Sequence, residues 1–439
     1  MLTAVLAIAA PASAQIAQPT LRSTRPARGL FGGGVGDVSQ SLIFTASLGG
    51  GYDKAEGGQI INGPGLAPIV SPPWVGSHVV AMTALGYSLS LGRVHAGATF
   101  DAHGRFRDGQ SNTFSGMGAG GNIGWDIASR TTLSASQGFS RQPRNMQLFY
   151  GGAFDATSTP NTVFDLSGAT SLADYTSSQT SVRFQQGITS RIALNAGYSY
   201  LTYFGSNNST MSDATTSTAA LGLSYSIAKG VYFRMGYGST TARYGASSQP
   251  VRYNGLVMDG GLVFDRALSL TRRTSVTFST GLTGARDDAG LVHYFVAGRG
   301  TLSYELGRSW TTAVNYRRGV DFDQTFGQPI VMDMVSAGIS GDLNRRFQAS
   351  AGVAGSWGSI GINAGASGYN AYSASADLRT ALTRQLGISL SYAYRHYFVD
   401  DQRSLPIGMQ PSTDRHSIRA TLDLWVPLFT RARRPDATR

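Results

Sequence analysis

Apolar and polar residues alternate one by one through long stretches of this 439-residue chain. In 385–399, Ile388, Leu390, Tyr392 and Tyr394 share one parity, and the other parity holds mainly Gly, Ser, Ala and Arg. A period of two predicts a β-strand, because successive side chains point to opposite faces. The stretch is longer than the usual ~5–6 residue strand of a soluble sheet. It would have one apolar face and one face of small or charged residues.

The same alternation predicts eighteen strands. We expect them at about 40–53, 77–91, 94–106, 115–128, 131–142, 175–189, 192–204, 214–228, 231–244, 251–268, 274–285, 291–306, 309–321, 329–343, 346–359, 368–382, 385–399 and 415–429. Tight connections that carry a basic residue alternate with connections that are mostly longer and more polar. Short turns at one end and long loops at the other are typical of an up-and-down meander.

The polar parity decides between two kinds of β architecture. A β-propeller or β-solenoid would bury apolar side chains between its blades or rungs. A strand with a continuous apolar face and a polar face suits a closed barrel in a lipid bilayer, where closure satisfies every backbone N–H and C=O group. We therefore expect 40–429 to form an all-β, transmembrane, antiparallel up-and-down β-barrel of about 18 strands, with short periplasmic turns and long extracellular loops.

Composition agrees with this architecture. The chain contains 56 Gly, no Cys and only 14% charged residues, against about 25% in typical soluble proteins. No apolar run reaches the roughly 18 residues that a membrane-spanning helix requires. Zero Cys leaves no disulfide or thiolate metal site. Backbone pairing is the remaining source of order for an exported protein of this size.

Both termini suggest export to the periplasmic side of an outer membrane. Residues 1–14 contain a short apolar stretch followed by Ala-Ser-Ala, which predicts a cleavable signal peptide. Residues 15–39 are expected to be a flexible periplasmic segment. Residues 430–439 are expected to be a basic periplasmic tail. The predicted location is integral to the bacterial outer membrane.

The export signal, the alternating strands, the basic tight turns and the closing strand HSIRATLDLWVPLF together resemble a Gram-negative outer-membrane β-barrel. The resemblance implies insertion by the barrel-assembly machinery and contact with outer-membrane lipid and lipopolysaccharide. Within such barrels the chain most resembles the beta-barrel porin 2 type found with exopolysaccharide systems, and in architecture the alginate-export porins. Two departures are TRARRPDATR after Phe429, where relatives usually end on the aromatic residue, and Pro427, which interrupts the alternation.

The parity opposite to the apolar residues should line the interior. A barrel of this size is wide enough for an aqueous channel, and Arg side chains there could contact carboxylate or sulfate groups. Stiffening of the wall by cross-strand pairs, such as Arg395 with Asp377 or Asp423, is the alternative. The candidate pore-lining residues are Arg183, Arg234, Arg299, Arg317, Arg379, Arg395, Arg419, Asp259, Glu305, Asp377 and Asp423.

The longest insertion, 143–174, is unusually apolar for a loop. Its candidate constriction residues are Phe149, Tyr150, Phe154 and Phe164. We expect the insertion either to fold into the interior and narrow it or to pack as a cap on neighbouring loops. Aromatic residues near strand ends, including Trp125, Trp310 and Tyr397, are expected to form interfacial girdles.

Candidate chemistry is sparse. The six His residues show no metal-binding spacing, and no acid/base cluster emerges, so no catalytic, cofactor-binding or metal site is expected. The predicted function is an outer-membrane channel that exports exopolysaccharide, possible partners being periplasmic polysaccharide-export components. A small-solute diffusion porin is the first alternative, and an outer-membrane enzyme or adhesin with a loop-borne site is the second. Nucleic acid is not an expected partner, although the net charge is +11.

Overall fold

The structure is a computed structural model. It describes residues 38–55, 58–60, 69–71, 74–107, 114–145, 169–205, 214–228, 231–244, 251–264, 273–286, 291–307, 309–323, 328–362, 366–400 and 411–432. Side chains are not described at a few strand ends, in the strands 58–60 and 69–71, or in the strand 251–264. Within these ranges no helix is long and apolar enough to cross a membrane.

Every regular element in the described ranges is a β-strand. Eighteen of them form one sheet. They are β1 (Val38–Ala55), β4 (Trp74–Leu91), β5 (Val94–Arg107), β6 (Phe114–Ala128), β7 (Thr131–Asn145), β8 (Ala169–Gly187), β9 (Ile192–Gly205), β10 (Ala214–Ala228), β11 (Val231–Tyr244), β12 (Val251–Phe264), β13 (Thr274–Arg286), β14 (Val292–Leu306), β15 (Trp310–Asp323), β16 (Gln328–Asp342), β17 (Phe347–Ile360), β18 (Ser367–Ala381), β19 (Leu386–Val399) and β20 (Ser412–Ala432). The remaining two, β2 (Gly58–Ile60) and β3 (Ile69–Ser71), form a separate hairpin.

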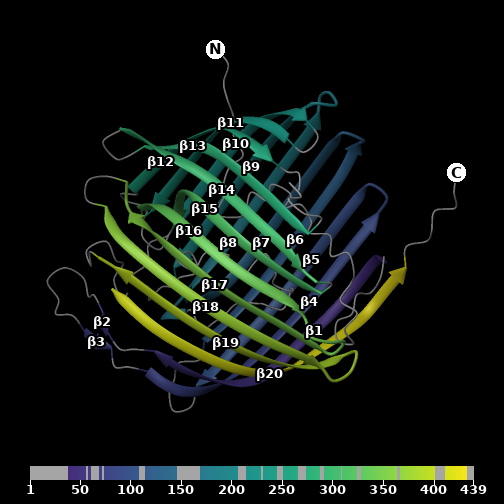
Figure 1. The fold of residues 1–439 in the computed structure, drawn as a ribbon, viewed down its shortest axis with the longest axis vertical. Coiled ribbons are helices and arrows are strands. Elements are labelled where there is room, and N and C mark those ends of the chain that lie inside the picture. Colours follow the sequence, from purple (N-terminus) through teal and green to yellow (C-terminus); the bar gives the residue numbers. More distant parts are fainter. Residues whose placement is uncertain are drawn as a thin grey trace.

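The sheet closes on itself. Each strand pairs antiparallel with its neighbour along the chain, and β1 pairs with β4 on one side and with β20 on the other. Figure 1 shows β14 to β20 as the near wall of the resulting barrel and β4 to β8 as the far wall. The predicted all-β up-and-down barrel of about eighteen strands is confirmed. Closure satisfies the backbone groups that an open edge would leave unpaired.

The two ends of the barrel differ. At one end, described connections are as short as 92–93 and 129–130 and extend to only four residues, as in 382–385. At the other end the connections are mostly longer, up to 146–168. We call these the turn end and the loop end. Because Val38 pairs with Ala432, the barrel begins and finishes at the turn end.

The four-residue turns share a local chemistry. In 188–191 the hydroxyl oxygen of Thr189 accepts the backbone N–H groups two and three residues later, at 3.1 and 3.0 Å. Thr383 does the same in 382–385, and the side-chain oxygen of Asn344 does so in 343–346. A short polar side chain at the second turn position therefore replaces the ladder partner that the reversing backbone lacks.

Several features differ from the sequence prediction, the largest shift being that of β8, which begins at Ala169 rather than 175, within the expected 143–174 insertion. The β2–β3 hairpin lies in a connection expected to be irregular. Strand β12 ends at Phe264 rather than 268, and β20 continues to Ala432, into the expected tail. Pro427 sits inside β20, opposite Ile43 and beside a register irregularity. Pro lacks a backbone donor, so a bulge is one of the few places in a sheet that accepts it.

Candidate functional site on the inner wall

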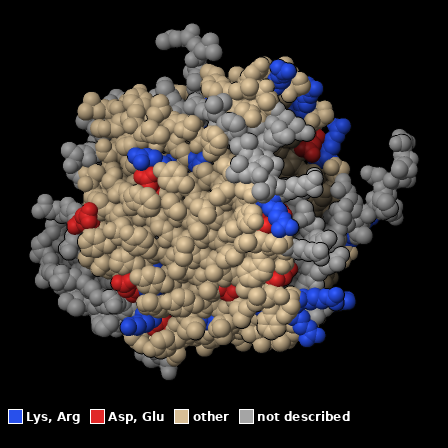
Figure 2. All heavy atoms as spheres, in the orientation of Figure 1, with Lys and Arg blue, Asp and Glu red and all other residues tan. Residues whose placement is uncertain are grey.

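The barrel wall has an outer face that carries large exposed apolar side chains and an inner face of the opposite parity. Leu48, Val79, Phe100, Val296 and Val353 on the outer wall are 50–60% exposed. Figure 2 shows the near wall as mostly uncharged, with blue atoms gathered along the edge toward which the β20 arrow of Figure 1 points. The inner wall holds mainly Gly, Ser, Thr and charged residues.

Parity places the predicted basic residues on the inner wall. Each of Arg183, Arg234, Arg317, Arg379 and Arg419 follows or precedes an exposed apolar residue of the outer wall along its strand. Arg299 and Arg395 have the same inward parity on β14 and β19.

The predicted acidic residues vary more. Glu305 and Asp377 are exposed, whereas Asp423 is 5% exposed. Asp259 pairs through its backbone with Gly236, and its side chain is outside the described set. Phe149, Tyr150, Phe154 and Phe164 also lie outside the described residues, so the constriction loop stays a prediction.

On the inner wall, two pairs of arginines lie directly opposite each other on neighbouring strands. Arg299 of β14 is opposite Arg317 of β15, and Arg395 of β19 is opposite Arg415 of β20. Like charges in directly opposite positions are unfavourable in a sheet. Their placement concentrates positive charge on the inner wall at two positions.

The predicted partners of Arg395 are wrong in register. Asp377 lies opposite Ser391, and Asp423 lies opposite Gly387, both well along the strand from Arg395. Asp423 instead approaches Arg379 Nε at 3.9 Å, and it accepts hydrogen bonds from the hydroxyls of Ser389 and of Thr421, the latter at 3.0 Å. This acid therefore belongs to the turn-end half of the inner wall.

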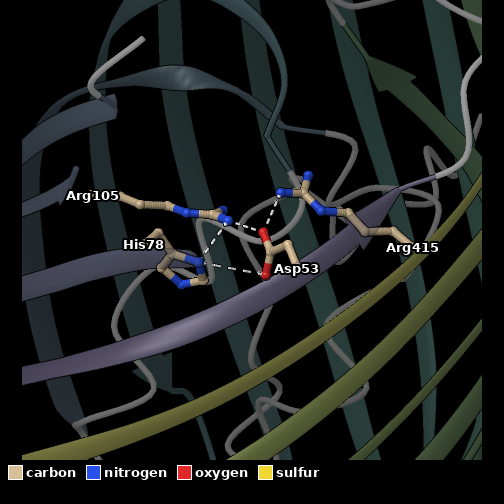
Figure 3. A network of polar contacts seen from close by, with 4 residues as sticks. All are labelled: Asp53, His78, Arg105 and Arg415. Carbon is tan, nitrogen blue, oxygen red and sulfur yellow. Dashed lines mark hydrogen bonds and ion pairs between the residues drawn. The ribbon is translucent and has the colours of Figure 1, made fainter. Parts of the chain in front are cut away.

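The most deeply buried charged group is a network near the loop end, shown in Figure 3. Asp53 of β1 is 0% exposed, and its Oδ2 forms an ion pair with Arg105 Nη2 and accepts a hydrogen bond from Arg415 Nη2 at 2.9 Å. His78 Nδ1 lies 3.3 Å from Arg105 Nη2. Arginine has no acceptor, so Arg105 donates and Nδ1 accepts, which leaves the proton of a neutral imidazole on Nε2. One carboxylate thus holds two guanidinium groups.

This network joins the two ends of the barrel chain. Its four residues come from β1, β4, β5 and β20, which are successive neighbours around the closing seam. Asp53 and Arg415 are 362 residues apart in sequence. None of the four is among the candidate residues predicted from the sequence. Alternation along each strand predicts that all four side chains point inward. Their mutual contact depends on the register between strands, which alternation alone does not give.

Glycine on a neighbouring strand makes room for these inner-wall side chains. A Cβ atom at Gly51 would lie 2.5 Å from Nε2 of His78 and 2.7 Å from the backbone oxygen of Ile418. A Cβ at Gly118 would lie 2.6 Å from Asp101 Oδ1. Part of the high glycine content therefore serves close side-chain to backbone approach.

An apolar cluster lies on the inner wall beside the charged seam. It comprises Ile330, Met332, Met334, Ile360, Tyr369, Ala371, Tyr397 and Val399, all buried. The prediction that Tyr397 belongs to an interfacial girdle is wrong, because its parity is inward and it is 2% exposed. Trp125 is 49% exposed on the outer wall, as a girdle residue should be.

In the described ranges, no group of three or more His, Asp or Glu side chains could hold a metal ion.

No family model matches the sequence, and no curated protein matches it.

Several solved structures resemble the fold at low identity. The siderophore receptor PirA from Pseudomonas aeruginosa is 10% identical to this chain, with a TM-score of 0.41. The alignment covers 88% of this chain and 80% of the receptor. Pseudomonas aeruginosa OpdL is 12% identical, with 89% and 99% covered and a TM-score of 0.43. Pseudomonas aeruginosa OccK2 (OpdF) in complex with glucuronate is 10% identical, with 90% and 100% covered and a TM-score of 0.44.

Proposed function

We propose that the chain is an integral barrel of the bacterial outer membrane whose interior is a pore for polar, preferentially anionic solutes. The observation that carries the proposal is the segregation of side chains across the closed wall. Large apolar residues are exposed outside, and arginines with small polar residues lie inside. In water the outer face would be unfavourable, whereas hydrocarbon outside and water inside satisfy both faces.

The height of the apolar outer stretch supports a membrane. On β19 the outward residues run from Leu386 through Ile388, Leu390 and Tyr392 to Tyr394 before His396 introduces a polar side chain. On β1 they run from Leu42 to Tyr52 before Lys54. These lengths match the roughly 9–11 residues that a tilted strand needs to cross a bilayer.

The interior supports a preference for anions. Barrels of roughly 16–18 strands are wide enough to leave an aqueous channel. The facing pair Arg299–Arg317, together with Arg395, would raise the local concentration of anions by its summed field, whereas Arg415 is held by Asp53. Guanidinium groups also bind carboxylates and sulfates in a bidentate manner.

The finer proposal concerns the solute. Small anionic solutes are the class that these arginines favour. Exopolysaccharide export is a second candidate, supported by the sequence resemblance, and with it the periplasmic export partners. In either case the barrel-assembly machinery would insert the chain. No residue is assigned a catalytic role, and an enzyme or adhesin with a loop-borne site remains the third class.

Conductance in planar bilayers tests the pore. The purified, heat-modifiable barrel should give ohmic steps, and a salt gradient should give a reversal potential on the anion-selective side. Combining Arg299→Gln with Arg395→Gln should move that reversal potential toward zero. An anionic polysaccharide that blocks the current from one side would favour export. Absence of conductance steps from correctly folded protein would refute the pore.

A further inference from the structure

A polar and aromatic cluster lies on the outer wall at the loop end of β19 and β20. The Tyr394 hydroxyl donates to Asp414 Oδ1 at 2.7 Å, and His396 Nδ1 lies 3.1 Å from the same oxygen. The Tyr392 hydroxyl lies 2.9 Å from Nδ1 of His416. These contacts orient both imidazoles through Nδ1. Nδ1 of His396 donates to the carboxylate, whereas Nδ1 of His416 can accept from the Tyr392 hydroxyl, which places the proton of a neutral His416 ring on Nε2.

A lysine completes the cluster from the adjoining strand. Lys54 of β1 is exposed and lies directly opposite His416 in the β1–β20 register. His416 is exposed as well, and the Tyr394 ring lies 4.9 Å from its ring, centroid to centroid. Lys54, His416 and His396 are thus three nitrogen-bearing side chains on three neighbouring strands. Asp414 orients His396, and the Tyr392 hydroxyl orients His416.

The cluster sits where the apolar outer surface ends on β1 and β20 and where His396 interrupts it on β19, with Phe398 following at 41% exposure. The last apolar outward residues below it are Tyr52 on β1, Ile418 on β20 and Tyr394 on β19. Tyr52 and Ile418 are 48% and 46% exposed. Tyrosines with their hydroxyls directed toward polar groups are typical of the membrane–water interface. The cluster is therefore level with the headgroups of the leaflet at the loop end.

We propose that Lys54 and His416 form a docking site for a phosphate group of the phosphorylated glycolipid, lipopolysaccharide, that makes up this leaflet. The inference rests on the proposed outer-membrane location. Phosphate oxygens accept hydrogen bonds, which matches the ammonium group of Lys54 and the Nε2–H of His416, while the exposed apolar residues below face the acyl chains. A cationic group beside a tyrosine-lined apolar surface fits an anionic headgroup with attached hydrocarbon.

A second ion pair on the outer wall has a different balance of acid and cation. Arg318 Nη1 donates to Asp333 at 3.2 and 3.4 Å, and the Tyr316 hydroxyl donates to the same carboxylate at 2.6 Å. There one acid neutralises one cation. At the seam, the exposed ammonium group of Lys54 lies opposite His416 rather than opposite an acid, so the seam cluster has the larger capacity for an external anion.

Thermal unfolding in a zwitterionic detergent tests the site. Lipopolysaccharide should raise the unfolding temperature of the wild-type barrel, and Lys54→Gln combined with His416→Gln should weaken its apparent affinity by about tenfold. Arg93→Gln combined with Arg384→Gln is the matched control. It removes two exposed cations at the turn end and should leave the lipid effect unchanged.

Repeating the unfolding experiment with different ligands tests whether the phosphate group of the lipid is recognised. Dephosphorylated lipopolysaccharide should lose most of the effect on the wild type, and inorganic phosphate alone should not reproduce it. Equal stabilisation by the dephosphorylated lipid, by free phosphate, or of the seam double variant would overturn the proposal. Conductance of the seam variant separates the two hypotheses, because it should remain normal even when lipid binding is lost. A wild type that binds the lipid but does not conduct would refute only the pore.

Discussion

Three neighbouring strands carry polar clusters at the same height on opposite sides of the barrel wall. The consecutive residues are Arg395 and His396 on β19, Arg415 and His416 on β20, and Asp53 and Lys54 on β1. The first of each pair points inward and the second outward. Inside, Asp53 is 0% exposed and fixes two guanidinium groups. Outside, Lys54 and His416 are exposed.

The comparison shows that burial, rather than residue type, separates the roles of the two clusters. A buried charge must be compensated by fixed partners, because removal from water costs several kcal/mol per ion in practice. The inner cluster is therefore committed to holding the seam between the first and last strands. An exposed charge keeps most of its hydration and contributes little to stability. The outer cluster is accordingly free to exchange water for a ligand.

Neutralising the inner acid should destabilise the barrel more than any change to the outer cluster. Asp53→Asn leaves Arg105 and Arg415 buried without their carboxylate, which should reduce the free energy of unfolding by about 3–5 kcal/mol. Urea unfolding of the barrel from lipid vesicles, followed by tryptophan fluorescence, measures this change. A loss below that of a surface substitution would mean that the network does not stabilise the seam.

A charge placed on either the outer or the inner face of one strand tests which face contacts lipid. Val353 of β17 is 56% exposed on the outer wall, and Val353→Arg should cost about 2–4 kcal/mol near the bilayer midplane. Ser350→Arg, on the inner wall opposite Asp377, is the control and should cost much less. The same vesicle-based unfolding experiment compares them. Equal costs for the two variants would contradict a wall with lipid on one side and water on the other.

Alternation along the chain was sufficient to predict the architecture and which face most side chains occupy. It predicted eighteen strands because an 18-stranded wall repeats one signal many times. It also placed Arg183 and Arg379 on the inner parity. Ambiguity at strand ends had less effect, since it changes boundaries such as that of β12 without changing parity.

Contacts between strands could not be predicted in the same way. The partner of Asp423 is Arg379 rather than Arg395, because pairing depends on register, and a small slip moves every contact. The Asp53–Arg415 contact adds closure of the barrel to that requirement, which no local pattern encodes. The error on Tyr397 had a simpler cause: a strand-end aromatic was assigned to the outer wall although its odd number gave it inward parity.

Two consecutive glycines offer a finer comparison of the faces. Gly51 points inward, where an added Cβ would contact the His78 ring and the Ile418 carbonyl, so Gly51→Ala should cost about 1–3 kcal/mol. Gly50 points outward, and its nearest atom would be 3.7 Å from the Cβ, an ordinary contact. Gly50→Ala should therefore be neutral or slightly stabilising. Urea unfolding midpoints of the two variants, compared where the dependence of unfolding free energy on urea is unchanged, test both expectations. A larger loss of stability for Gly50→Ala would show that the inner wall is not the more closely packed side.

The smallest expected effect lies on the outer side of the same strand. Lys54→Gln removes an exposed ammonium group one residue from Asp53, and it should change the free energy of unfolding in lipid-free detergent by no more than about 0.5 kcal/mol. The charge change has the same size as in Asp53→Asn, so the two variants isolate burial as the variable. In the presence of lipopolysaccharide, Lys54→Gln should reveal a deficit in stabilisation that is absent without the lipid. If the variant instead loses as much stability in plain detergent as Asp53→Asn, Lys54 contributes to the seam itself, and the division between a structural inner cluster and a ligand-binding outer cluster fails.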